Sequence, residues 1–155
     1  MKCMDLDNVD RRILEQLQVD ASLSNVELAE RVNSSAASCW RRVKALEAAG
    51  VLGPPVRLLD PVSLARSVNV ICNVRMRSHA REARRAFENL VCERKEILEC
   101  FSMSGDWDYL LRIVAADVAD YERFLMSVLL DHPSVGGASS HFALSMTKYT
   151  TALPI

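Results

Sequence analysis

The spacing of apolar residues in the first third of the chain predicts three short helices. The first is expected to open at Asp7 and to end near Asp20. The second follows Ser24, which forms a capping box with Glu27, and the third runs from a turn at residues 33–35 to Ala49, with Gly50 as its stop. The apolar face of the first helix is expected to be Val9, Ile13, Leu14 and Leu17, that of the second Val26, Leu28, Ala29 and Val32, and that of the third Ala36, Cys39, Val43 and Leu46.

Three short helices, of which the second and third are joined by a tight polar turn, are typical of a helix-turn-helix, in which the third helix enters the major groove of DNA. Residues 51–59 have the size of a small β wing or of an extended linker. Pro54 and Pro55 cannot donate ladder hydrogen bonds, so any hairpin there is brief. We place the domain boundary at Asp60-Pro61, which gives a DNA-binding domain over 1–59 and a second domain over 60–155.

The second domain is expected to have the order βαββαβ. Apolar and polar residues alternate from Val68 to Met76, which indicates a strand. Two further helices are expected, one with an inward face of Ala83, Phe87, Leu90 and Val91, and a later one with an inward face of Val118, Tyr121, Leu125, Val128 and Leu129. Between these helices we expect strands at Ile97–Met103 and Asp108–Ala115. A last strand is expected at Ser140–Tyr149, where Phe142, Leu144 and Met146 share one face. This order predicts an α+β, ferredoxin-like unit with both helices on one face of an antiparallel sheet. The other face needs cover, so two such sheets are expected to pack in a homodimer.

Composition narrows the class of protein. The 155 residues are 50% hydrophobic and 25% charged, which suits one or two globular domains. Apolar runs fall far short of the roughly 18 residues needed to span a bilayer, and the acidic N-terminus does not look like a signal peptide, so we expect a cytoplasmic protein without a membrane partner. The five cysteines, Cys3, Cys39, Cys72, Cys92 and Cys100, show no CxxC spacing, which favours reduced thiols over disulfides or a metal site.

The net charge of −1 hides a local imbalance: the stretch from Arg31 to Leu46 holds basic residues and no acid. Basic side chains and hydroxyl groups at the start of a helix suit phosphates and base edges, although a solvated helix face would look the same. Trp40 either packs on the first helix, which we favour, or lies against sugar and phosphate. The candidate DNA-binding residues are Ser35, Ala37, Ser38, Trp40, Arg41, Arg42 and Lys44.

Several strings resemble the Lrp/AsnC family of prokaryotic transcriptional regulators. Residues 6–14, 25–32 and 39–51 resemble its winged helix-turn-helix half, and residues 98–100, 104–111, 132–135 and 148–154 resemble its amino-acid-sensing half, in order. The resemblance implies a transcription factor that reads DNA with Ser35–Ala49, forms dimers and usually tetramers or octamers, and takes a free amino acid as effector. No other cofactor is implied.

The resemblance also implies an effector cleft between the sensing domains of neighbouring subunits. One side would be Ser102, Ser104, Gly105, Asp106 and Asp108, and the other Ser139, Ser140 and His141. Carboxylates such as Asp106 and Asp108 suit an ammonium group, and the serine hydroxyls suit a carboxylate. An ordinary hairpin turn is the alternative for Gly105 and Asp106. Phe142-Ala143-Leu144 and the ending Lys148–Pro154 look most like members that sense cysteine or a branched-chain amino acid.

Two other classes compete with a regulated transcription factor. An enzyme is disfavoured, because His79, His132 and His141 are scattered and the chain lacks an HExxH motif, a phosphate-binding loop and a nucleophile elbow. An architectural DNA-binding protein without an effector remains an alternative, and only a sensor would show a ligand-dependent shift in DNA binding.

Overall fold

The computed structural model describes residues 5–155, and Cys3 lies outside them. The chain divides into two compact units. One comprises the described residues up to Leu58 together with Lys148–Ile155, and the other comprises Leu59–Thr147. The segment Lys148–Ile155, expected in the second domain, therefore groups with the N-terminal unit.

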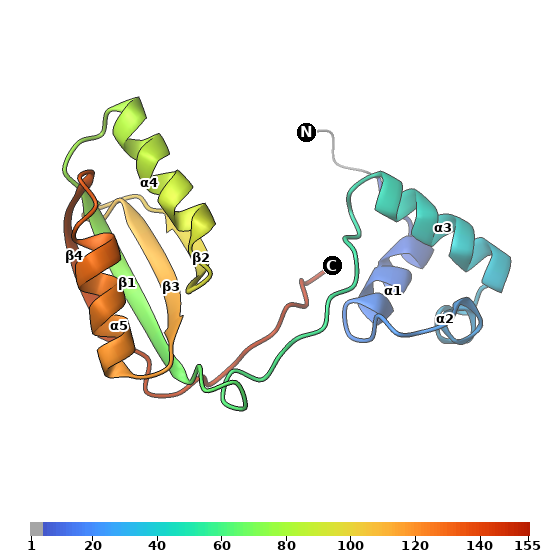
Figure 1. Cartoon of the computed structure of the whole chain (residues 1–155). Coiled ribbons are helices and arrows are strands. Elements are labelled where there is room, and N and C mark those ends of the chain that lie inside the picture. Colours follow the sequence, from blue (N-terminus) through green and yellow to red (C-terminus); the bar gives the residue numbers. More distant parts are fainter. Residues whose placement is uncertain (1–4) are drawn as a thin grey trace. The chain divides into compact units, whose positions relative to one another are not determined.

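The N-terminal unit holds the three predicted helices, α1 (Asn8–Leu17), α2 (Asn25–Val32) and α3 (Ala36–Ala48) (Figure 1). Asp7 caps α1 by accepting from the backbone N–H groups of Val9 and Asp10, both at 2.8 Å. The capping box of α2 is confirmed, because Ser24 N–H donates to Glu27 Oε2 at 2.8 Å and Glu27 N–H donates to Ser24 Oγ at 3.3 Å. The helix α1 stops at Leu17, short of Asp20.

The core of this unit is formed by the expected apolar faces, with one exception. Ile13, Leu28, Val32, Cys39 and Leu46 are almost wholly buried. Val26, predicted to be buried, is 59% exposed. It stands two residues before Leu28, which turns it about 200° away from the buried stripe of α2.

Of the two alternatives for residues 51–59, a small β wing or an extended linker, the structure shows the linker. Residues 53–60 form no strand, so no β hairpin follows α3. A turn then precedes the sheet: Arg66 N–H donates to the carbonyl of Pro61 at 2.7 Å, and Ala65 takes a left-handed φ of 51°. That conformation is unusual for a residue with a Cβ atom.

The C-terminal unit has the predicted order βαββαβ. Its elements are β1 (Val68–Met76), α4 (Arg81–Glu93), β2 (Ile97–Ser102), β3 (Tyr109–Ala115), α5 (Val118–Phe124) continuing into the π-helical turn η1 (Leu125–Leu129), and β4 (Val135–Phe142) (Figure 1). The strands pair antiparallel in the order β2-β3-β1-β4. Helices α4 and α5 cover one face of this sheet.

The covered face holds a single core, and the other face is partly apolar. Phe87, Tyr121, Phe124 and Leu129 pack on the inward side chains of the sheet, among them Val70, Cys72, Val74, Leu111 and Ile113. Val118, expected to be inward, is 60% exposed at the first position of α5. By strand alternation, the open face carries Ile71, Phe101, Leu110 and Val114, and Phe101 is 52% exposed.

The last strand was predicted at the wrong place. It spans Val135–Phe142 instead of Ser140–Tyr149, and Leu144 is 100% exposed. Gly136 and Gly137 concealed its start, since glycine is rare in strands. It ends near the beginning of its antiparallel partner: Phe142 pairs with Val70, and Ala143 N–H donates to the carbonyl of Asn69, close to the start of β1.

Candidate nucleic-acid interface and effector cleft

Helix α3 is fixed at both ends by its own sequence. Ser35 Oγ accepts from Ser38 N–H at 3.2 Å, so the serine that caps the helix is also one of the predicted DNA contacts. At the other end, Gly50 has a φ of 70°, and the N–H groups of Gly50 and Val51 donate to the carbonyls of Glu47 and Leu46. These two bonds form a Schellman motif, which explains why the helix stops before Gly50.

Four of the predicted DNA-binding residues share one exposed face of α3. Ala37, Trp40, Arg41 and Lys44 are spaced i, i+3, i+4 and i+7, and all four are exposed. Trp40 is 55% exposed, so the prediction that it packs on the first helix is wrong. The reason is phase: Cys39 and Leu46 occupy the buried face, and Trp40 lies about 100° around the helix from Cys39.

Arg42 is turned away from this face and is held by carboxylates of the first helix. One of its terminal nitrogens lies 2.7 Å from Asp7 Oδ2 and 2.7 Å from Asp10 Oδ1, and Arg42 and Asp10 are 27% and 11% exposed. The N–H of Asp10 and the guanidinium of Arg42 lower the pKa of Asp7. The two carboxylates, Asp10 first, raise the pKa of Arg42. The charge of Arg42 is thus compensated within the unit, whereas Arg41 forms no ion pair with any residue in 5–155.

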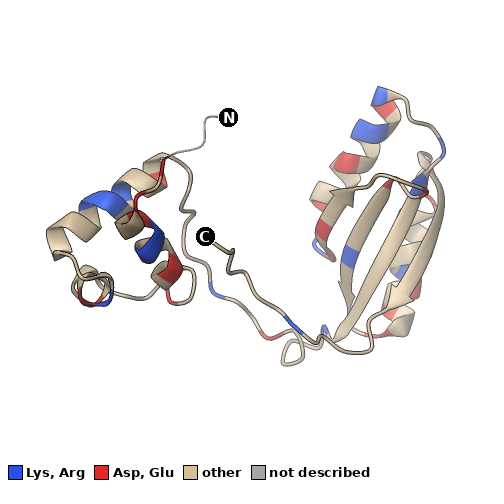
Figure 2. Ribbon diagram, turned by 180° about the vertical axis from the view of Figure 1, so that it is seen from behind, with Lys and Arg blue, Asp and Glu red and all other residues tan. Residues whose placement is uncertain are grey.

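Lys44 remains on the exposed face but has a partner there. Its Nζ lies 2.7 Å from Glu47 Oε2, and the two side chains are 57% and 40% exposed. An exposed i, i+3 pair is weak, so a phosphate can replace Glu47 as the partner of the ammonium group. Figure 2 shows the basic residues of α3 beside acidic residues in the same unit.

In the C-terminal unit, the loop between β2 and β3 is tied to β1. Gly105 has a φ of 116°, which favours glycine at this turn. Asp108 Oδ2 accepts from Met76 N–H at 2.7 Å, and Asp108 Oδ1 lies 3.3 Å from His79 Nδ1. Arg75 adds a second tie, because its guanidinium lies 4.8 Å from the ring centre of Trp107. The roles of Met76, His79 and Arg75 were missed in the sequence, since only the fold brings β1 to this loop.

The serines predicted on the other side of the cleft point in opposite directions. Ser139 pairs with Asn73 and His141 with Ile71, both on the open face of the sheet. Ser140 points toward the helices, where its Oγ lies 2.5 Å from the hydroxyl of Tyr121. Burial raises the pKa of Tyr121. The prediction that Ser140 lines the same side of a cleft as Ser139 and His141 is therefore corrected, because neighbouring strand residues face opposite sides of a sheet.

Within one chain, the two predicted sides of the cleft do not face each other. The loop with Ser104, Gly105 and Asp106 precedes β3, whereas Ser139 and His141 lie on β4. Strand β1 lies between β3 and β4 in the sheet. Ser102, the last residue of β2, pairs with Tyr109. Within one chain, strand β1 thus separates the two predicted sides.

Residues 5–155 contain no helix that is long and apolar enough to cross a bilayer. The same residues contain no group of three or more His, Cys, Asp or Glu side chains placed to hold a metal ion.

Comparisons with known proteins match both units. A family model described as winged helix-turn-helix DNA-binding matches residues 6–52, and one described as Lrp/AsnC ligand binding domain matches residues 69–153. The DNA-binding transcriptional activator DecR of Escherichia coli (strain K12) is 37% identical over 97% of this chain and 99% of its own. The leucine-responsive regulatory protein of that strain is 36% identical over 97% of this chain and 92% of its own.

Solved structures agree along nearly the whole chain. A transcriptional regulator from Neisseria meningitidis in complex with L-Met has a TM-score of 0.93 and 39% identity, over 97% of both chains. An AsnC family transcriptional regulator from Agrobacterium tumefaciens has a TM-score of 0.91 and 41% identity, over 96% of this chain and 97% of its own. DecR and the two proteins of known structure are thus named as transcriptional activators or regulators.

Proposed function

The chain belongs to the Lrp/AsnC family of DNA-binding transcriptional regulators, and on that premise we propose that it reads double-stranded DNA through one face of α3 under the control of a free amino acid. The amino acid would bind between C-terminal units of neighbouring subunits and change either the DNA affinity or the assembly. The protein would act in the cytoplasm, where its DNA lies.

The exposed face of α3 is the observation that carries the DNA-binding part of the proposal. Trp40 and Arg41 stand on it beside Lys44, while Arg42 is neutralised by Asp7 and Asp10. Arg41 is then the side chain best able to read a base, and Lys44 suits a phosphate. Ser35 and Ser38 lie at the N-terminal end of the helix, where N–H groups and the helix dipole favour a phosphate.

The proposed effector cleft rests on the loop that precedes β3. Asp106 is exposed, and Asp108 is held by Met76 N–H while it remains 23% exposed. One carboxylate could bind an ammonium group while the other orders the loop. Ser139 and His141, on the open face of β4, are the better candidates for the facing side than Ser140. The similar regulator from Neisseria meningitidis was solved with L-Met, which supports an amino acid with an apolar side chain, such as cysteine or a branched-chain amino acid.

Homo-oligomerisation follows from the open face of the sheet. Phe101 and Leu98 are 52% and 49% exposed, and Ile71, Leu110 and Val114 are only partly covered. Apolar side chains in such number favour burial against a second copy. We therefore propose a homodimer formed by two sheets, which would associate further into tetramers or octamers. Light scattering of the full chain carrying Leu110→Asp is expected to return a smaller particle than the unchanged protein.

Selection of binding sites from a random duplex library tests the DNA-binding function. The affinity for the selected duplex is then measured with and without each of the twenty common amino acids. A selected consensus with a ligand-dependent affinity supports the proposal. Binding without any sequence preference or ligand response would instead identify an architectural DNA-binding protein.

A further inference from the structure

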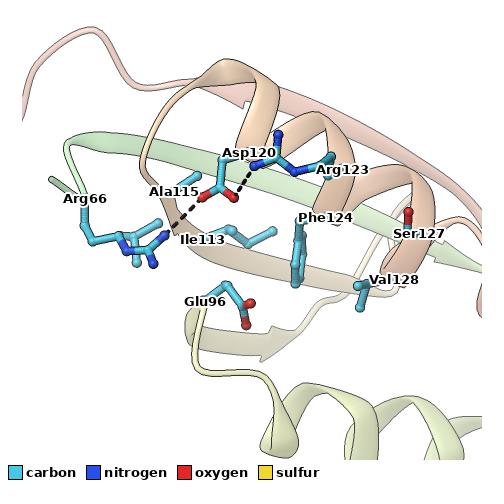
Figure 3. A pocket seen from close by; sticks show the side chains of 10 residues that line it. Arg66, Glu96, Ile113, Ala115, Asp120, Arg123, Phe124, Ser127 and Val128 are labelled. Atoms are coloured by element: carbon cyan, nitrogen blue, oxygen red, sulfur yellow. Dashed lines mark hydrogen bonds and ion pairs between the residues drawn. The ribbon is translucent and has the colours of Figure 1, made fainter.

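A cavity of about 260 Å³ lies in the C-terminal unit, away from the loop that carries Asp108 (Figure 3). Its floor is apolar and consists of Ile113 and Ala115 of β3 with Phe124 and Val128 from α5 and η1. Asp108 directly precedes Tyr109, the first residue of β3, whereas Ala115 is the last. The cavity therefore lies toward the end of β3 that is opposite to the loop carrying Asp108.

Two guanidinium groups meet on one side of this cavity. A terminal nitrogen of Arg66 lies 3.0 Å from Asp120 Oδ2, and one of Arg123 lies 2.9 Å from Asp120 Oδ1. Asp120 also accepts from Ala116 N–H at 3.0 Å, and this bond, followed by the interaction with Arg123, lowers its pKa. Two positive charges thus share one carboxylate. Both guanidinium groups keep N–H donors that have no partner among residues 5–155, so they can bind a further carboxylate.

Glu96 supplies the opposite charge at another part of the cavity wall (Figure 3). The residue is positioned by its backbone, since its carbonyl accepts from Val114 N–H at 2.9 Å. In the part of the chain that the structure describes, its carboxylate has neither a hydrogen bond nor an ion pair.

We propose that this cavity is a second ligand site, which takes a small zwitterion of the amino-acid class. The carboxylate of the ligand binds Arg66 and Arg123, its ammonium group binds Glu96, and its apolar side chain lies on Phe124 and Val128. The size fits this class, because the cavity is smaller than the roughly 300–1,000 Å³ typical of sites for drug-sized ligands. The site shares no residue with the proposed effector cleft.

Occupancy of this site would act on the segment that joins the two units. Arg66 follows the left-handed Ala65 and stands two residues before β1. Its side chain is half exposed, and among the described residues its one ion pair is that with Asp120. A ligand that binds both Arg66 and Arg123 would fix the point at which the joining segment enters the sheet.

Methyl NMR of the full chain tests the site with L-leucine and its two half-molecules, 4-methylpentanoate and 3-methylbutylamine. L-leucine is expected to shift the methyl signals of Ile113 and Val128. Each half-molecule lacks one charged group and should bind about 10- to 150-fold more weakly, the range expected for a lost charge-assisted hydrogen bond. Equal affinity for L-leucine and 4-methylpentanoate would overturn the role of Glu96 and with it the proposal.

A pair of matched variants completes the test. Glu96→Gln is expected to lower the affinity for L-leucine at Ile113 and Val128 to that of 4-methylpentanoate. Glu122 is an exposed residue of α5 outside the cavity, so Glu122→Gln should leave the affinity for L-leucine unchanged. Unmoved Ile113 and Val128 signals would refute the second site even if an amino acid alters DNA binding. Shifted signals without any effect of amino acids on DNA binding would refute the proposed function and leave the site standing.

Discussion

The side-chain amide of Gln18 exchanges two hydrogen bonds with the backbone of Leu153. Gln18 Nε2 donates to the carbonyl of Leu153 at 2.9 Å, and Leu153 N–H donates to Gln18 Oε1 at 2.9 Å. The amide group thus pairs with the tail as a neighbouring strand would. A cavity of about 480 Å³ beside this contact is lined by Leu17, Leu23 and Thr151, among others.

Replacing Gln18 with Ala should release the tail from the N-terminal unit. Two neutral hydrogen bonds contribute about 1–2 kcal/mol together, so amide exchange at Leu153 should accelerate about 5- to 30-fold. Hydrogen exchange measured by NMR provides the readout. Gln16→Ala, on the same helix, is the control and should leave Leu153 unchanged; if both variants accelerate it equally, the contact does not hold the tail.

Arg41 and Arg42 are expected to differ in what their loss changes. Arg41→Ala should weaken binding to a selected duplex by about 1–3 kcal/mol, the range for a base contact, without changing thermal stability. Arg42→Met should lower the free energy of unfolding by about 1–2 kcal/mol, because it leaves Asp10 covered and without its charged partner. Anisotropy titrations and thermal denaturation separate the two effects. A loss of stability in Arg41→Ala together with a loss of DNA affinity alone in Arg42→Met would contradict the orientation of α3.

Lys44 and Glu47 should act on DNA affinity in opposite directions. Lys44→Ala is expected to reduce the slope of log affinity against log salt by about one, because one phosphate contact is lost. Glu47→Gln frees the ammonium group from its 2.7 Å partner and removes a negative charge, so it should strengthen binding to all sequences. An unchanged salt slope in Lys44→Ala would remove Lys44 from the interface.

Asp108 can be examined by two substitutions of different size. Asp108→Ala should weaken amino-acid binding in the effector cleft by about 10- to 150-fold and leave DNA binding without ligand intact. Asp108→Asn keeps an oxygen that can accept from Met76 N–H, so it should retain the order of the loop and lose only the charge. Calorimetry on both variants distinguishes the roles: full affinity in Asp108→Asn would show that the residue orders the loop without contacting the ligand.

Acid should weaken the N-terminal unit through Asp7. The pKa of its carboxyl is lowered in the folded protein by the Asp10 N–H and then by Arg42, so the folded state binds fewer protons than the unfolded state. The resulting stability is present above the ordinary pKa of an aspartate and is lost as the pH falls toward the folded value. Carboxyl NMR titration should give a pKa of Asp7 below its ordinary value of 3.8 and closer to it in Arg42→Met. An ordinary pKa of Asp7 in the unchanged protein would contradict its contacts with the Asp10 N–H and Arg42.

Much of the fold could be predicted because it depends on local chemistry. Asp7, Ser24 and Ser35 cap helices through hydrogen bonds that span three residues, and the strand Val68–Met76 has a strict period of two. The end of β4 could not be predicted, because it depends on the pairing with β1. Phe142, Leu144 and Met146 alternate as a strand would, yet the paired register with β1 stops at Phe142.

The residue types of the candidate sites could be predicted from the sequence, but the directions in which their side chains point could not. Arg41 and Arg42 are neighbours of the same kind, and only the position of α1 shows that Arg42 meets Asp7 and Asp10. Ser139 and Ser140 face opposite sides of β4, which required its register with Cys72 and Asn73. The cavity between Arg66, Glu96 and Arg123 is formed by three segments that are separated in the sequence, so no sequence motif predicts it.

The contact between Gln18 and Leu153 also determines what a label at the end of the chain would report. Because the last residues belong to the N-terminal unit, a fluorophore attached after Ile155 follows the DNA-binding unit and not the sheet from which the chain has just emerged. A fluorophore pair on α1 and on the C-terminus would then measure the docking of the tail. Relative motion of the two units would have to be recorded from an internal position in the C-terminal unit, such as Glu122 on α5.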